Sequence, residues 1–113
     1  MNTIADLRVC RVKALNDQFR RTFRGGRVMM TAGVVALGPY RVAMLLQKVR
    51  TFDRFDPDND PDGEHDFGSF VDGGETFFWK IDYFDWELNY SSPDPADPGV
   101  TTRVLTLMLA SEY

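Results

Sequence analysis

The amino-acid sequence predicts an α+β fold, in which a small antiparallel sheet of three to four strands carries three helices in the order α-β-α-β-β-β-α. Two segments repeat apolar residues at the three- and four-residue spacing of a helix, and a third repeats them at every second position, as a strand does. Packing helices on one side of a small sheet lets both kinds of element bury their apolar faces. The 113 residues contain no internal repeat and no low-complexity linker, so we expect a single domain over residues 1–113.

The first helix is expected over residues 3–24, where Val12, Leu15 and Phe19 lie on one apolar stripe. A glycine pair follows and ends the helix, because glycine readily adopts the left-handed conformation found at helix C-termini. The short apolar run at residues 27–32 is then expected to form a buried strand.

A second helix is expected to begin at Pro39, since proline fits the first helical turn, and its apolar face continues to Phe52. Residues 34–37 lie between two glycines and are expected to form a turn or a short strand. The next segment, residues 53–66, contains seven acidic residues and two prolines, and both features favour a loop over a continued helix.

Two strands, residues 67–71 and 75–84, are expected to pair through a hairpin turn, because the Asp-Gly-Gly sequence between them permits positive φ angles. The longer strand would place Phe77, Trp79 and Ile81 on one face, which we take as the core side.

The C-terminal part is expected to add a third strand of this sheet and a final helix. Residues 86–90 would pair back across a tight turn at Asp85. Residues 100–111 would form the helix, with Val104, Leu107 and Met108 on its apolar face.

The net charge of −4 hides an uneven distribution along the chain. Residues 1–50 hold ten basic and two acidic residues, whereas residues 51–113 hold three basic and fifteen acidic ones. Two interpretations follow. The two parts can fold against each other and neutralise their charges, or opposite faces can stay exposed, a basic face for an anionic partner and an acidic face for a basic one.

The strongest local pattern is Asp58-x-Asp60-x-Asp62-Gly63, which matches the start of a calcium-binding loop. The bidentate glutamate that an EF-hand needs is absent, because its position is occupied by Ser69. We therefore exclude an EF-hand and keep a weaker, irregular calcium site as an alternative. Its ligands would be Asp58, Asp60, Asp62 and Asp66.

His65 is the only histidine, and it supports a second alternative, a small enzyme in which His65 serves as acid or base. No hydrolase, phosphate-loop, dinucleotide or metalloprotease motif accompanies it. One cysteine, Cys10, cannot form an internal disulfide, which favours a cytoplasmic location. Residues 28–40, the longest uncharged stretch, are shorter than the about 20 residues that a membrane-spanning helix needs.

Basic residues are scarce where the aromatic strands are expected. Between Phe55 and Thr102 the only one is Lys80, which argues against direct nucleic-acid binding by those strands. A dense array of carboxylates can instead imitate the phosphates of nucleic acid and occupy a basic groove on another protein.

Four runs of the sequence resemble a domain-of-unknown-function family of small proteins that are encoded on plasmids and other mobile elements of bacteria. The runs are residues 12–20, 58–68, 79–83 and 94–98, and the Gly63-Glu64-His65-Asp66-Phe67-Gly68 run is the most specific of them. No established activity comes with this resemblance, so it assigns no catalytic residue. It implies a genetic context in which small proteins often blunt host defence or help transfer.

We therefore expect a non-enzymatic interaction protein. It would bind to a basic, nucleic-acid-binding surface of a host protein. Its concrete form would be an anti-defence inhibitor, acting on a CRISPR effector or a restriction enzyme. The expected partner-binding residues are acidic, and they are Asp56, Asp58, Asp60, Asp62, Glu64 and Asp66, followed by Asp82, Asp85 and Glu87. This hypothesis requires that the arginines of the N-terminal part leave these carboxylates exposed.

Overall fold

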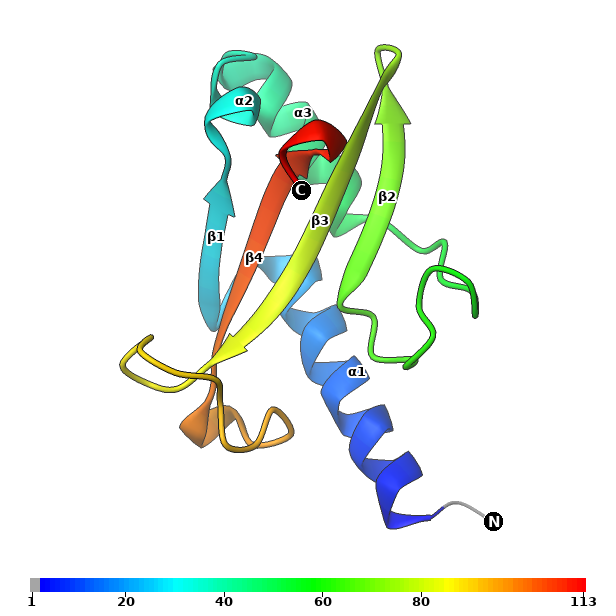
Figure 1. Ribbon diagram of the computed structural model, residues 1–113, viewed down its shortest axis with the longest axis vertical. Coiled ribbons are helices and arrows are strands. Elements are labelled where there is room, and N and C mark those ends of the chain that lie inside the picture. The colour runs from blue at the N-terminus through cyan, green and yellow to red at the C-terminus, as the bar shows by residue number, and fades with distance from the viewer. Residues whose placement is uncertain (1–2) are drawn as a thin grey trace.

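Three α-helices and a four-stranded mixed sheet make up residues 3–113, which the computed structural model describes, and the fold class is α+β as predicted (Figure 1). In chain order the elements are α1 (Ile4–Thr22), β1 (Gly26–Met30), α2 (Ala32–Val35), α3 (Pro39–Arg50), β2 (Phe67–Asp72), β3 (Glu75–Phe84), the 3-10 turn η1 (Pro98–Val100), β4 (Thr102–Leu109) and the 3-10 turn η2 (Ala110–Glu112). No helix in this described part is long and apolar enough to cross a membrane.

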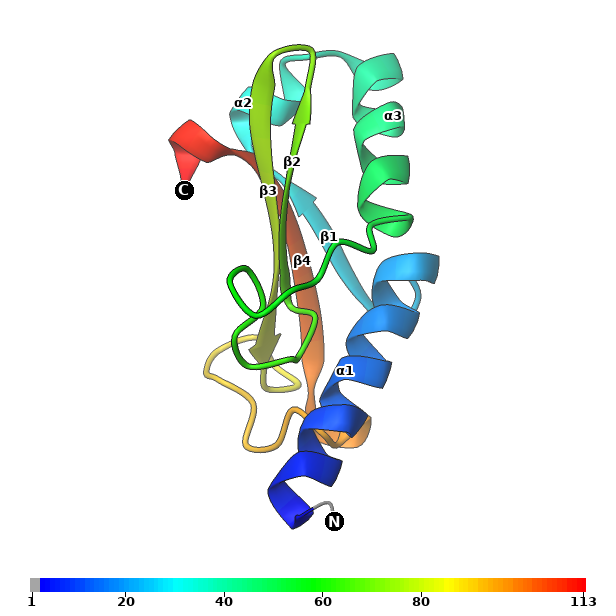
Figure 2. The same ribbon diagram turned by 90° about the vertical axis from the view of Figure 1, so that its right-hand side faces the viewer.

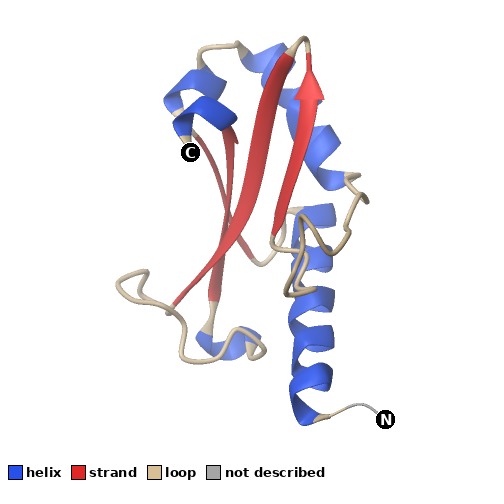
Figure 3. Cartoon of the chain, turned by 45° about the vertical axis from the view of Figure 1, so that its right-hand side comes forward, coloured by secondary structure: helices blue, strands red, loops and turns tan. Residues whose placement is uncertain are grey.

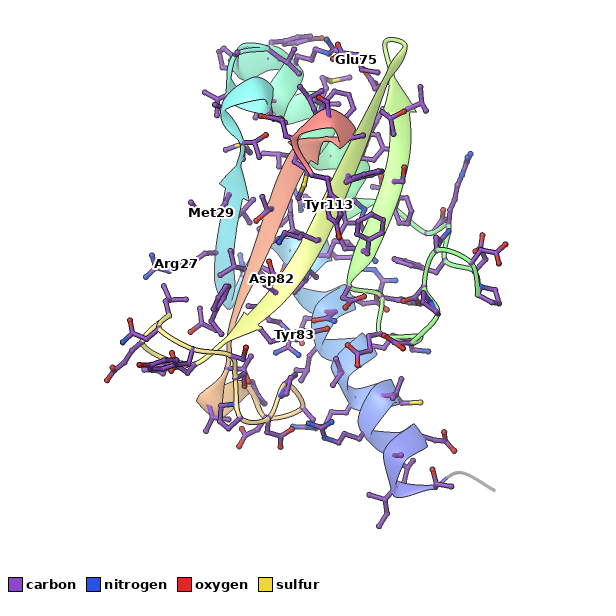
Figure 4. All side chains as sticks on the ribbon, viewed as in Figure 1. Arg27, Met29, Glu75, Asp82, Tyr83 and Tyr113 are labelled. Carbon is purple, nitrogen blue, oxygen red and sulfur yellow. The ribbon has the colours of Figure 1, made fainter. Side chains whose placement is uncertain are left out.

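The strands lie in the order β1-β4-β3-β2, and β4, the last strand of the chain, is central. It pairs in parallel with β1 and antiparallel with β3. The helices α1 and α3 lie on the same face of the sheet, one beyond the other along the long axis of the molecule (Figure 2, Figure 3). On the opposite face, Tyr113 packs edge-on against Phe78, with ring centroids 5.6 Å apart (Figure 4).

The hydrophobic core fills the space between the helices and the sheet. Phe77, Trp79 and Ile81 of β3 are buried there, as the alternation of the sequence predicts, and Leu105 and Leu107 of β4 lie beside them. The helices contribute Phe19, Leu45 and Val49.

The hairpin between β2 and β3 forms as predicted. Gly73 and Gly74 both have positive φ angles, 59° and 79°, which is the requirement of the two-residue turn that matches the twist of the strands. Gly68 of β2 is opposite Trp79, and a Cβ atom at this glycine would collide with the indole ring. The bulky core residue of β3 therefore needs a glycine on the neighbouring strand.

A buried arginine joins the C-terminal ends of the two long helices. Arg20 of α1 has 0 % exposed surface, and its Nη1 donates to the main-chain oxygens of Val49 and Arg50 at 3.1 Å. In return, Arg50 Nε of α3 donates to the main-chain oxygen of Arg21 at 3.0 Å. The last carbonyl groups of a helix have no partner within it, so each helix end here is capped by an arginine of the other helix.

Residues 34 and 35 belong to the helix α2, and only residues 36 and 37 form the turn that is one of the two alternatives expected for residues 34–37. Two further expectations are wrong. Residues 86–90 form no strand, because Asp85 N donates to the oxygen of Tyr90 and Leu88 adopts a left-handed conformation, which closes a turn. The sheet is mixed and not wholly antiparallel, because β1 runs parallel to β4.

The largest correction concerns the C-terminus, where residues 100–111 contain the strand β4 and not a helix. The apolar residues of this segment fit the three- and four-residue spacing of a helix as well as the alternation of a strand. In the structure Leu105 and Leu107 face the core, and Val104 and Met108 face the other side of the sheet. The segment forms a strand because it pairs with β1 on one side and β3 on the other. This pairing cannot be recognised from the local sequence pattern.

Replacing Arg20 tests the role of the helix-end junction. We expect Arg20→Ala to lower the free energy of unfolding by about 3 kcal/mol or more, because it leaves Asp17 and two carbonyl groups without their buried donor. Urea denaturation measures the change. Arg21→Ala, one residue further along and exposed, is the control and should change the stability by less than about 0.5 kcal/mol. Equal effects of the two variants would contradict the assignment.

Candidate functional site

The segment of residues 53–66, here called the acidic loop, leads from α3 to β2 and forms an ordered series of turns (Figure 1). Asp60 N donates to the oxygen of Asp56 at 2.8 Å. The Asp56 carboxylate accepts from the main-chain nitrogens of Asp58 and Asn59 at 2.9 and 3.0 Å. The loop therefore supplies many of its own hydrogen bonds, as short polar side chains in turns commonly do.

A buried polar network holds the end of the acidic loop against α1 and the sheet. Asn16 of α1 donates from Nδ2 to the main-chain oxygen of Glu64 at 3.0 Å and to Tyr83 Oη at 2.7 Å. Tyr83 Oη in turn donates to Glu64 Oε2 at 2.9 Å, and Arg103 Nε donates to Asn16 Oδ1 at 2.7 Å. Each partner in this network is satisfied by another, which is the condition for a buried polar group to be stable.

Burial shifts the pKa values of two members of this network, Tyr83 and Arg103. It raises the pKa of the Tyr83 hydroxyl well above its usual range, so the phenol keeps its proton and donates to Glu64. Burial also lowers the pKa of Arg103, and the nearby Tyr83 and Glu64 oppose this shift. Arginine stays charged even so, because its ordinary pKa is far above neutrality.

His65 is the second anchor of the acidic loop. Its Nδ1 donates to Asp17 Oδ1 on α1 at 2.9 Å, and its ring stacks on Phe55 with centroids 3.7 Å apart. The carboxylate of Asp60 accepts from the main-chain nitrogen of His65 at 3.1 Å and lies 3.7 Å from its Nε2. His65 has a left-handed backbone conformation, with φ of 56°, and its contacts with Asp17, Phe55 and Asp60 hold it in this conformation.

The predicted partner-binding residues of the loop fall into two classes. Asp56, Asp58 and Asp62 are exposed. Asp60 is buried, and Glu64 and Asp66 are half-buried. Asp60 and Glu64 hold the loop in place through the contacts described above.

No lysine or arginine among residues 3–113 forms an ion pair with a carboxylate of the acidic loop. The basic side chains that do form ion pairs bind acidic residues elsewhere. Arg8 pairs with Asp94 at 2.7 Å, and Lys48 pairs with Asp72 at 3.0 Å. The charges of the two parts of the chain therefore do not neutralise each other at this loop.

The remaining predicted residues lie on or after β3. Asp82 pairs with Lys80 at 2.9 Å, and its side chain leaves the sheet on the face opposite that of Tyr83 (Figure 4). Asp85 accepts from the main-chain nitrogen of Asn89 at 3.0 Å, and Glu87 is exposed. Of these three, the structure brings only Asp82 close to the acidic loop, where it shares a groove of about 380 Å³ with Asp62 and Asp66.

The four carboxylates proposed as calcium ligands do not converge. Asp58 and Asp62 are exposed, whereas Asp60 turns toward His65. Within the described residues, no group of three or more histidine, cysteine, aspartate or glutamate side chains is arranged to hold a metal ion.

Sequence reasoning missed the residues that position the loop, namely Asn16, Asp17, Phe55, Tyr83 and Arg103. One signal was available. Asn16 and Arg20 lie on the same helical stripe as Val12 and Phe19, and all four are buried. A polar residue on an apolar stripe indicates a buried hydrogen-bond network.

Asp66 gives the site a measurable pH dependence. Burial, together with the nearby Glu64, raises its pKa to about 6. Because its unfolded-state pKa is about 3.9, the native state binds more protons than the unfolded state between these two values, and the free energy of unfolding falls as the pH rises through them.

We therefore expect Asp66→Asn to be more stable than the wild type near pH 7, by about 1 kcal/mol at this half-exposed position, and to lose that advantage near pH 4. Urea titrations at the two pH values measure the difference. A gain of the same size at both pH values would show that it does not come from the ionised carboxylate.

Comparison with known proteins supports the family and gives no function. No curated protein and no solved structure matches the chain. A family of proteins of unknown function, DUF3768, matches residues 30–112, from the last residue of β1 to the last residue of η2. The match covers the acidic loop, its anchors Tyr83 and Arg103, and three of the four strands in full. The expected resemblance to a domain-of-unknown-function family is thus confirmed, and the chain belongs to the DUF3768 family.

Proposed function

We propose that this chain is a non-enzymatic interaction protein whose acidic loop binds a basic surface of another protein. The observation that carries the proposal is that Asp56, Asp58 and Asp62 are exposed on an ordered loop and form no ion pair with a lysine or arginine of residues 3–113. Carboxylates that are held in place and left unpaired suit a partner that brings the missing positive charges.

The order of the acidic loop favours binding because little conformational entropy remains to be lost. The turn at Asp56, the stacking of Phe55 on His65 and the Asn16 network fix both ends of the exposed segment before any partner arrives. A preorganised surface avoids part of the cost that a flexible acidic segment has to meet on binding. This assigns Asp60, Glu64 and His65 to positioning the loop, and Asp58 and Asp62 to direct contact.

The chemistry of the partner follows from the close spacing of the exposed carboxylates Asp56, Asp58 and Asp62 along the acidic loop. A nucleic-acid-binding groove is lined by lysine and arginine side chains that neutralise phosphates. An acidic loop of this kind competes for such a groove, and inhibition of a CRISPR effector or a restriction enzyme is the concrete role we propose. A host nucleic-acid-binding protein with a different task would satisfy the same chemistry.

Charge reversal tests the proposal. We expect the wild-type protein, immobilised and exposed to a nuclease-treated bacterial lysate, to retain at least one basic nucleic-acid-binding protein, and moderate salt to release it, because screening weakens contacts between exposed charges. The double variant Asp58→Lys/Asp62→Lys should lose that protein. Neither side chain takes part in a hydrogen bond or ion pair within residues 3–113, so folding should be preserved.

Glu75→Lys at the far end of the β2–β3 hairpin is a control for each single reversal, because it makes the same change of charge away from the loop (Figure 4). Unlike Asp58 and Asp62, Glu75 forms an ion pair, with Arg41 at 3.4 Å, so a thermal melt first has to show that this variant is folded. It should retain the captured protein. Capture that is insensitive to Asp58→Lys/Asp62→Lys, or that Glu75→Lys abolishes equally, would contradict the role of the acidic loop.

A further inference from the structure

The outer edge of β2 presents main-chain groups with no partner. Ile81 N donates to the oxygen of Asp66 at 2.8 Å, which fixes the pattern of the antiparallel ladder. Along β2, every second residue forms main-chain hydrogen bonds with β3. Gly68 and Phe70 therefore direct their main-chain groups toward β3, and Ser69 and Val71 direct theirs away from it, toward the free edge of the sheet. No loop or side chain within residues 3–113 forms a hydrogen bond with the main-chain groups of Ser69 and Val71.

This edge also lacks the features that normally protect an exposed strand. The sequence of β2, Phe-Gly-Ser-Phe-Val-Asp, has no charged residue before its last position, no proline and no lysine. Val71 is 64 % exposed beside the free main-chain groups. Natural proteins usually blunt such edges with charges, prolines or bulges, and an unprotected apolar edge readily pairs with another strand. The opposite edge strand, β1, carries Arg27 in its second position.

A groove of about 500 Å³ runs along this edge, between β2 and the end of α3. Ser69, Phe70 and Val71 line it on the sheet side, and the segment from Thr51 to Arg54 lines it on the other, together with Lys48. The volume is in the range of sites that enclose several residues of a ligand. The charged residues of its lining are Lys48, Arg54 and Asp53, so the lining carries one positive charge in excess. Lys48 pairs with Asp72 at 3.0 Å, whereas Arg54 forms no ion pair within the described residues.

We infer that this groove binds an extended acidic segment of another protein, which adds to the sheet as a fifth strand beside β2. The main chain of the segment would pair with Ser69 and Val71, as in other cases of strand addition to an exposed sheet edge. Side chains on one side of the added strand would face Lys48 and Arg54, where carboxylates complement the charge. Asp53 of the acidic loop lines this groove, but Asp56, Asp58 and Asp62 do not, and the inference does not rest on the function proposed for those three carboxylates.

A defined probe tests the inference: a fluorescein-labelled peptide that alternates glutamate and valine over six residues. We expect saturable binding by fluorescence anisotropy, and slower hydrogen exchange at the amides of Ser69 and Val71 when the peptide is added. The same peptide with lysine in place of glutamate should bind at least tenfold more weakly, because it brings like charges to Lys48 and Arg54.

Two variants separate strand pairing from general attraction. Ser69→Pro removes an outward amide without touching the ladder to β3 and should weaken binding at least tenfold, whereas Ser69→Thr keeps the amide and should bind like the wild type. Arg54→Glu should also weaken binding. Arg24→Glu should not, because Arg24 is also exposed but does not line the groove. Arg54→Glu keeps the test decisive if Ser69→Pro fails to fold.

Several results would overturn the inference. They are the absence of binding at millimolar peptide, equal binding by Ser69→Thr and Ser69→Pro, and exchange protection confined to another part of the chain. A fourth is a concentration-dependent dimer in sedimentation that Ser69→Pro dissociates, because the occupant of the edge would then be a second copy of this chain and not an acidic partner. Charge reversal of Asp58 and Asp62 should leave peptide binding intact, which keeps this test separate from that of the proposed function.

Discussion

The burial of the Arg20 guanidinium is the constraint on which the arrangement of the two long helices, the sheet and the acidic loop depends. It bonds the end of α3 through two carbonyl groups and pairs with Asp17 at 3.0 Å. Its guanidinium carbon lies 5.4 Å from the ring centroids of both Phe55 and Trp79. Removing a charge from water is costly, so a buried arginine is stable only if many partners surround it. Those partners come from α1, α3, β3 and the acidic loop, and these contacts place the four elements relative to one another, although Arg20 Nε has no hydrogen-bond partner among residues 3–113.

Asp17 extends this constraint to the surface. Its Oδ1 accepts from Arg20 on one side and from His65 on the other, at 3.0 and 2.9 Å. The position of the acidic loop is therefore linked, through one carboxylate, to a charge in the core. The buried carboxylate of Asp60 forms hydrogen bonds within the fold, whereas the carboxylates of Asp56, Asp58 and Asp62 remain exposed to solvent. The division follows from geometry, since the anchors occupy only one side of the loop.

Local signals in the sequence predicted the two long helices, the acidic loop and the β2–β3 hairpin, because each is decided by spacing, proline or glycine within a few residues. The strand β4 was not predictable in this way, because its apolar residues fit both periods and its partners are distant in sequence. The same limit applies to the site. The acidic residues are evident in the sequence, but Asn16, Tyr83 and Arg103 meet only in the folded chain.

Several arginines of this fold bond main-chain carbonyl groups and not the carboxylates of the acidic loop. A guanidinium donates to any oxygen with free lone pairs, main-chain carbonyl oxygens included. Arg11 donates to the oxygen of Ala96, Arg20 and Arg50 to the ends of the facing helices, and Arg103 to the oxygen of Pro95. Carbonyl groups satisfy the hydrogen bonds of a guanidinium without cancelling its charge. Arg8, Arg41 and Lys48 do pair with carboxylates of residues 51–113, but these carboxylates belong to Asp72, Glu75 and Asp94 and not to the acidic loop. The exposed Asp56, Asp58 and Asp62 therefore keep their negative charge without a lysine or arginine partner among residues 3–113, and this charge acts over distances up to the Debye length.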